Sequence, residues 1–197
     1  CVIMAFSMQS LANNILLDSL QPMARQSAKT VEANIHMLAD RMMNVADDFK
    51  ADIGAGSSLS DRESVWKERQ EILTETAETY ELYTIALYDL EGRLIQGIDG
   101  APKTIEQGLF ALMKETDNLT IDSSTIFQDK LGITMGIPIK GEEGTILYLA
   151  CVYKYDTLND VISSINLGKN GMAYMVNPEG VVTGHPDKSL VLGGSTL

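Results

Sequence analysis

The chain has 197 residues, of which 45% are hydrophobic, so it is long enough to bury one large core or two small ones. Its 27 acidic and 15 basic residues give a formal net charge of −12. This balance excludes nucleic acid as an expected partner, because phosphate binding needs clustered Lys and Arg. The two cysteines, Cys1 and Cys151, match neither a disulfide framework nor a zinc site, and we expect neither a metal nor another cofactor.

An apolar stripe predicts a long N-terminal helix. Apolar or small residues recur every three or four positions between residues 17 and 49, which places them on one side of a helix. These residues are Leu17, Leu20, Ala24, Ala28, Val31, Ile35, Leu38, Met42, Val45 and Phe49. The sequence leaves open whether Pro22 lies in the first turn or inside a helix that runs from residue 1. The apolar run at residues 1–6 is too short to cross a bilayer by itself, so it is either the start of a buried helix or the outer end of a transmembrane helix.

Further helices and strands are predicted from capping and alternation patterns. Ser60 and Glu63 form a capping box for a helix that runs to about Glu81. Thr104 and Gln107 are expected to cap a short helix from Ile105 onwards. Segments rich in β-branched and aromatic residues predict strands at 83–88, 93–97, 132–140 and 145–155. An apolar helix is predicted at 158–168.

An internal repeat is the most specific signal in the chain. Residues 173–182 repeat the pattern of residues 85–94 at an offset of 88 positions, with an apolar strand, an Asx-x-Glu-Gly turn and a second apolar strand. Each copy follows a predicted helix, which indicates a true structural repeat. Only residues 181–197 follow the second turn, so we expect the second copy to be unfinished.

This order of elements resembles the double Cache extracytoplasmic sensor domains of bacterial transmembrane receptors, most of all methyl-accepting chemotaxis proteins. The most family-like residues are Gly168, Lys169, Gly171, Ala173 and Tyr174, followed by Gly184, His185, Pro186 and Asp187. The resemblance implies an α+β fold, in which a PAS-like antiparallel sheet is flanked by helices and packed on the long helix.

The resemblance also implies a domain organisation and a function. Residues 1–22 would be the end of a transmembrane helix and its lead-in, residues 23–165 the long helix with a membrane-distal module, and residues 166–197 the start of a truncated membrane-proximal module. This region would lie outside the cell and sense a small molecule, while the full protein would be anchored in the cell membrane. The intact receptor would form a homodimer through the N-terminal helix. The sensor part of a histidine kinase or a diguanylate cyclase is the alternative.

The ligand class is not carried over from the family. Its amino-acid-binding members have a Tyr, then Arg-x-Trp-Tyr, then a late Asp, whereas the one Trp here is Trp66 and no Arg follows Arg93. The candidate ligand contacts are Tyr88, Met135, Tyr153 and Lys154. Because neighbouring residues of a strand point to opposite faces, at most one of the last two faces a pocket. Because no Arg is expected in the pocket and Lys154 is the one cation that we can place near it, we expect an uncharged or singly anionic ligand rather than an amino acid.

Two other classes of protein fit the sequence less well. In an enzyme, His185 and Asp187 could form an acid–base pair, but no nucleophile motif, phosphate loop or metal-ligand cluster accompanies them, so we expect them to stabilise a turn. A structural coiled-coil adaptor would explain the apolar stripe. It would not explain the strand-rich segment from residue 83 to residue 155.

Overall fold

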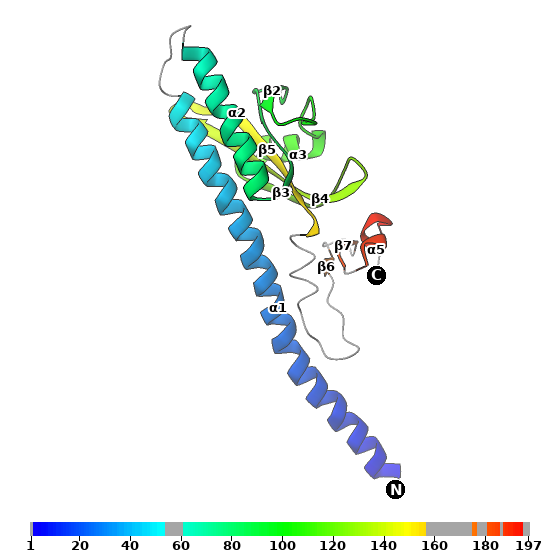
Figure 1. Cartoon of the computed structure of the whole chain (residues 1–197). Coiled ribbons are helices and arrows are strands. Elements are labelled where there is room, and N and C mark those ends of the chain that lie inside the picture. Colours follow the sequence, from blue (N-terminus) through cyan, green and yellow to red (C-terminus); the bar gives the residue numbers. More distant parts are fainter. Residues whose placement is uncertain (1, 54–60, 157–174, 177–180, 186, 195–197) are drawn as a thin grey trace.

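The chain folds as one long helix that carries an antiparallel sheet. The computed structural model describes residues 2–53, 61–156, 175–176, 181–185 and 187–194 (Figure 1). The helices are α1 (Val2–Ile53), α2 (Asp61–Thr79), α3 (Gln107–Thr116) and α5 (Lys188–Leu192). The strands are β1 (Leu82–Tyr88), β2 (Leu94–Gly97), β3 (Thr120–Phe127), β4 (Lys130–Gly141), β5 (Gly144–Lys154), β6 (Met175–Val176) and β7 (Val182–Gly184). The first five strands form one sheet in the order β2-β1-β5-β4-β3, which confirms the predicted α+β class with a PAS-like sheet.

Helix α1 is continuous through Pro22, so the second of the two sequence interpretations is the correct one. At 1.5 Å per residue its 52 residues span about 78 Å. Figure 1 shows that the sheet and α2 lie beside the C-terminal half of α1, while the N-terminal half extends away from them. In the part of the chain that the structure describes, no helix combines the length and the apolar character that crossing a bilayer requires.

The predicted stripe is buried where α1 meets the sheet. Leu38 is 2% exposed, and Met42 and Phe49 are 0% exposed. Towards the N-terminus the buried stripe begins at Val31, because Ala28 is exposed and the side chains of Leu17, Leu20 and Ala24 lie outside the described residues. From Val31 to Phe49 the described stripe extends over about five turns of the helix.

One face of the sheet forms the main core with α1 and α2, and we call it the α1 face. Its side chains include Ile85, Leu87, Ile133, Met135, Ile137, Ile139, Leu149, Cys151 and Tyr153. The Tyr153 hydroxyl donates a hydrogen bond of 3.1 Å to the Leu38 carbonyl oxygen. This bond satisfies the one polar group of a fully buried ring and sets the position of α1 along β5.

Two details of the predicted elements are corrected. The cap of α3 is Glu106, not Thr104, because its carboxylate accepts a hydrogen bond of 2.7 Å from the Leu109 amide. Strand β3 was not predicted, since Asp122 and Thr125 interrupt its apolar residues and a β-bulge separates them. The predicted cap at Ser60 and the helix at 158–168 lie outside the described residues.

The two copies of the repeat pair their strands in the same register. In the first copy Leu87 faces Gln96 and Tyr88 faces Leu94, with a bulge between Leu87 and Tyr88. In the second copy the pairs are Met175 with Gly184 and Val176 with Val182, with a bulge between Met175 and Val176. Each pair of the second hairpin is a pair of the first plus 88, so the sequence repeat is also a repeat of backbone geometry.

The second hairpin is attached to the end of the first sheet. Val182 and Val191 pack with Leu131 and Tyr155 in a small buried cluster. The His185 amide donates a hydrogen bond of 3.1 Å to the Tyr155 hydroxyl, and Lys188 forms an ion pair with Asp156. Tyr155 and Asp156, which follow β5, therefore link the first sheet to the second hairpin and α5.

His185 and Asp187 stabilise a turn, as the sequence predicts. The Asp187 amide donates to His185 Nδ1 at 2.8 Å. The Asp187 carboxylate caps α5 by accepting hydrogen bonds from the amide and the hydroxyl of Ser189, which lower its pKa.

We predict that Leu38→Asp destabilises the fold by about 3 kcal/mol or more, because it places a charge between α1 and the sheet. Asp40→Ala, on the exposed side of the same turn, should change the free energy of unfolding by less than about 0.5 kcal/mol. Chemical denaturation of both variants measures the difference. Equal losses of stability would show that the helix is oriented differently.

We also predict that amide hydrogen exchange is at least about tenfold faster in β6 and β7 than in β1, β4 and β5, because a two-stranded sheet is only marginally stable by itself. Exchange measured by mass spectrometry on peptides spanning 172–184 and 144–154 makes this comparison. Equal protection would mean that the second hairpin folds as part of the first sheet.

Candidate functional site

The α1 face of the sheet is filled by its own side chains. Met135 and Tyr153 are 0% exposed and pack among the residues of the main core. Burial raises the pKa of the Tyr153 hydroxyl far above its usual value. These observations assign a structural role to this face and leave the opposite face as the candidate site.

The opposite face, which we call the α3 face, has a row of small residues across all five strands. The row is formed by Gly97, Ala86, Ala150, Gly136 and Thr120, each paired with the next. Small side chains let the covering elements approach the sheet closely. A Cβ added to Gly136 would lie 2.3 Å from Met113 Sδ of α3, and one added to Gly97 would lie 2.8 Å from the Ala101 Cβ.

Aromatic side chains border this row at the end nearest α3. Tyr88 and Tyr148 are neighbours on β1 and β5, and both are buried with Leu109 and Met113 of α3. Tyr148 meets Phe110 edge to face, with ring centroids 5.3 Å apart. Burial raises the pKa of Tyr88 to about 12.

On the other side of the small row lies a row that carries hydroxyl groups. Thr84, Val152 and Thr134 are paired across β1, β5 and β4. The Thr134 hydroxyl donates to the Thr125 hydroxyl at 2.8 Å. Thr84 is 3% exposed, and its hydroxyl has no hydrogen-bond partner within the described structure. A buried hydroxyl without a partner costs stability, so it is a candidate contact for a ligand.

The segment from Ile98 to Lys103 covers part of the α3 face. The Tyr88 hydroxyl donates a hydrogen bond of 3.1 Å to the Pro102 carbonyl oxygen, which fixes this segment over β1. A Cβ added to Gly100 would lie 3.3 Å from Gln128 Nε2, at the turn between β3 and β4. β2 and β3 are the two edge strands of the sheet. The segment after β2 therefore reaches across the α3 face towards the opposite edge, at β3.

Lys154 lines a groove beside the first residue of β1, Leu82. This groove has a volume of about 520 Å³ and lies between α2, Ile98 and Lys154. Glu78, Glu81 and Asp99 also line it, so three carboxylates surround the one ammonium group. An anion would meet more repulsion than attraction here.

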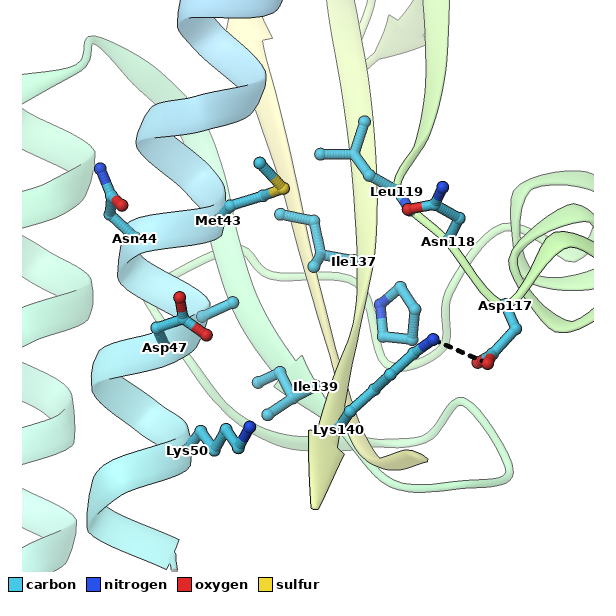
Figure 2. A pocket seen from close by; sticks show the side chains of 12 residues that line it. Met43, Asn44, Asp47, Lys50, Asp117, Asn118, Leu119, Ile137, Ile139 and Lys140 are labelled. Carbon is cyan, nitrogen blue, oxygen red and sulfur yellow. Dashed lines mark hydrogen bonds and ion pairs between the residues drawn. The ribbon is translucent and has the colours of Figure 1, made fainter. Parts of the chain in front are cut away.

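A second groove lies between α1 and β4. Figure 2 shows Lys50 of α1 and Lys140 of β4 on its rim, and its volume is about 300 Å³. Lys140 forms an ion pair of 2.7 Å with Asp117. Within the described residues, no three His, Cys, Asp or Glu side chains lie close enough together to hold a metal ion.

The four residues predicted as ligand contacts do not converge on one site. Met135 and Tyr153 lie in the core of the α1 face, Tyr88 lies on the α3 face, and Lys154 lies in the acidic groove. The substitution Tyr153→Ala cannot test ligand binding, because it removes a fully buried ring and would damage the core.

Thr84, Thr134 and Tyr148 are candidates that sequence reasoning missed. The sequence contained a signal for them. Thr84, Ala86 and Tyr88 occupy every second position of one predicted strand, and Tyr148, Ala150 and Val152 do so in another, so each set lies on one face. The residues that share a face with Tyr88 could have been read from this alternation. Their pairing across strands required the register.

Solved structures share this architecture over most of the chain. The ligand-binding domain of the Pseudomonas fluorescens chemoreceptor CtaA, in complex with L-isoleucine, superposes with a TM-score of 0.75 at 17% identity, over 98% of this chain and 76% of that chain. This chain has the fold of a chemoreceptor ligand-binding domain. The sensory domain of the Campylobacter jejuni chemoreceptor Tlp3 with isoleucine has a TM-score of 0.71 at 12% identity, over 94% of this chain and 76% of that one.

A third structure is the ligand-binding domain of the Pseudomonas aeruginosa amino acid chemoreceptor PctB with L-Arg, with a TM-score of 0.69 at 17% identity over 92% of this chain and 75% of that chain. No family model and no curated protein sequence matches the chain. The resemblance to double Cache sensor domains is thus confirmed at the level of the fold.

We predict opposite effects of two threonine-to-valine substitutions on stability. Thr84→Val should raise the free energy of unfolding by about 1 kcal/mol, because it removes a buried hydroxyl without a partner and keeps the shape of the side chain. Thr134→Val should lower it by about 1 kcal/mol, because the Thr125 hydroxyl loses its partner. Urea denaturation compares the two. Equal destabilisation would show that the Thr84 hydroxyl is hydrogen-bonded in the folded chain.

Proposed function

We propose that this chain is the extracytoplasmic small-molecule sensing module of a bacterial chemoreceptor, and that it binds its ligand on the α3 face. The observation that carries the proposal is the fold, which matches chemoreceptor ligand-binding domains over nearly the whole chain. No catalytic step is proposed, since His185 and Asp187 are engaged in a turn.

The placement of the ligand rests on the difference between the two faces. The α1 face is filled with large apolar side chains, whereas the α3 face combines small residues, tyrosines and threonines. The Thr84 hydroxyl is free to donate one hydrogen bond and to accept others. Tyr88 and the covering segment from Ile98 to Lys103 would border the ligand.

An uncharged ligand fits the described residues best. The named groups on the α3 face are hydroxyls, which bind neutral polar molecules well and balance a full charge poorly. Lys154, the cation expected to meet an anion, lies beside Glu78, Glu81 and Asp99, which weighs against an anionic ligand. The related chemoreceptor domains were solved with amino acids such as isoleucine and arginine. This chain would differ from them in ligand class.

The repeat supports the domain organisation that we propose. Residues 23–165 would form the membrane-distal module and residues 166–197 the start of a membrane-proximal one, supported by the shared register of the two hairpins. Residues 1–22 would lead in from a membrane anchor. The N-terminal half of α1, which extends beyond the sheet, would pair with its copy in a homodimer.

A thermal-shift screen of uncharged metabolites tests the function. A ligand should raise the melting temperature in proportion to the logarithm of its concentration above the dissociation constant, without being transformed. Thr84→Val should weaken binding about tenfold while leaving the fold intact, because the ligand loses one buried hydrogen bond. Thr30→Val, on the exposed surface of α1, is the matched control and should bind as the unaltered chain does.

Strong stabilisation by the common amino acids, with Thr84→Val unaffected, would contradict both the site and the ligand class. A screen in which no small molecule raises the melting temperature would contradict direct sensing by this module.

A further inference from the structure

The groove between α1 and β4 has the features of a second binding site. Strand β3 pairs with β4 only as far as Gly136, so from Ile137 onwards β4 has β5 as its one neighbour among the described strands. The connection from α3 to β3, at Asp117–Leu119, closes one side of the groove and α1 closes another (Figure 2). The resulting space of about 300 Å³ is large enough for a small organic molecule.

The groove has an apolar floor. Ile137 and Ile139 of β4 and Ala46 of α1 are buried beneath it, and Pro138 also lines it. Leu119 and Met43 add apolar surface on opposite sides. A ligand would therefore need an apolar body to displace water from this floor.

The rim carries two ammonium groups across this floor. Lys50 comes from α1 and Lys140 from β4, and Ile139 lies between them in the view of Figure 2. Lys140 is held in place by its 2.7 Å ion pair with Asp117, which is itself fixed by a 3.0 Å hydrogen bond from the Thr145 hydroxyl. No ion pair involves Lys50 within the part of the chain whose side chains are described. Its charge is available to a ligand.

The local charge balance opposes an anion less than the balance of the whole chain does. The rim has two lysines and two aspartates, Asp47 and Asp117, so it is neutral in a chain of net charge −12. Lys140 and Asp117 largely neutralise each other, so Lys50 is the main source of attraction for an anion. By contrast, the groove beside Lys154 has three carboxylates for one ammonium group.

We propose that the α1–β4 groove binds a small monocarboxylic acid with an apolar body, whose carboxylate lies between Lys50 and Lys140 and whose body lies on Ile137 and Ile139. This site is separate from the α3 face and does not depend on the proposed function. A molecule bound there contacts both α1 and the sheet, so it stabilises their association.

Benzoate is the probe, and benzamide is its neutral counterpart of the same shape. Calorimetric titration of the full chain should give a millimolar dissociation constant for benzoate, as expected for so small a ligand, and weaker binding for benzamide. Lys50→Met keeps the aliphatic stem and removes the charge, and should weaken benzoate binding about three- to fivefold. Asp47→Asn removes the rim carboxylate that has no ion pair among the described side chains, and should strengthen benzoate binding about twofold.

Lys29→Met is the matched control, because Lys29 is an exposed lysine of the same helix away from the groove. It should leave benzoate binding unchanged, as should Thr84→Val on the α3 face. Equal affinity for benzoate and benzamide, equal effects of Lys50→Met and Lys29→Met, sensitivity to Thr84→Val, or no saturable binding below about 50 mM would each overturn the proposal.

Discussion

The structure depends on the burial of one side of α1 against one face of the sheet. Leu38, Met42 and Phe49 occupy the space between them, and the Tyr153 hydroxyl joins this interface to a helix carbonyl oxygen. Partners 115 positions apart in the sequence are thereby held at 3.1 Å. Because the interface is apolar and contains a specific hydrogen bond, the helix has one preferred position along the strands.

This interface also decides which face of the sheet is available for binding. Large side chains fill the α1 face beneath the helix, except in the groove between α1 and the end of β4. On the α3 face, Gly136 and Ala86 let α3 and the segment after β2 come close, and the row of hydroxyl groups beyond them includes the unsatisfied Thr84. The two faces of one sheet thus have different roles, because alternate residues of the same strands differ in size and polarity.

The repeat adds a second level of organisation. Both hairpins have the same pairs and the same bulge, so a short sequence pattern has specified a backbone geometry twice. In the first hairpin the Asp89 carboxylate accepts hydrogen bonds from the Glu91 and Arg93 amides, which fixes the turn. Tyr155 and Asp156, directly after β5, contact the second hairpin and α5, so movement of β5 would reach that hairpin through few residues.

The sequence by itself determined the elements whose signals are local. The stripe from Val31 to Phe49, the strands around Asp89 and the offset of 88 positions follow from periodicity and turn chemistry, which act over a few residues. Tertiary structure decided the rest. Strand β3 exists because β4 offers its polar residues a pairing edge, and Pro22 lies within a helix that continues on both sides of it. The separation of Tyr88 from Met135 and Tyr153 depends on which face α1 covers, and that choice is made by packing between segments far apart in the chain.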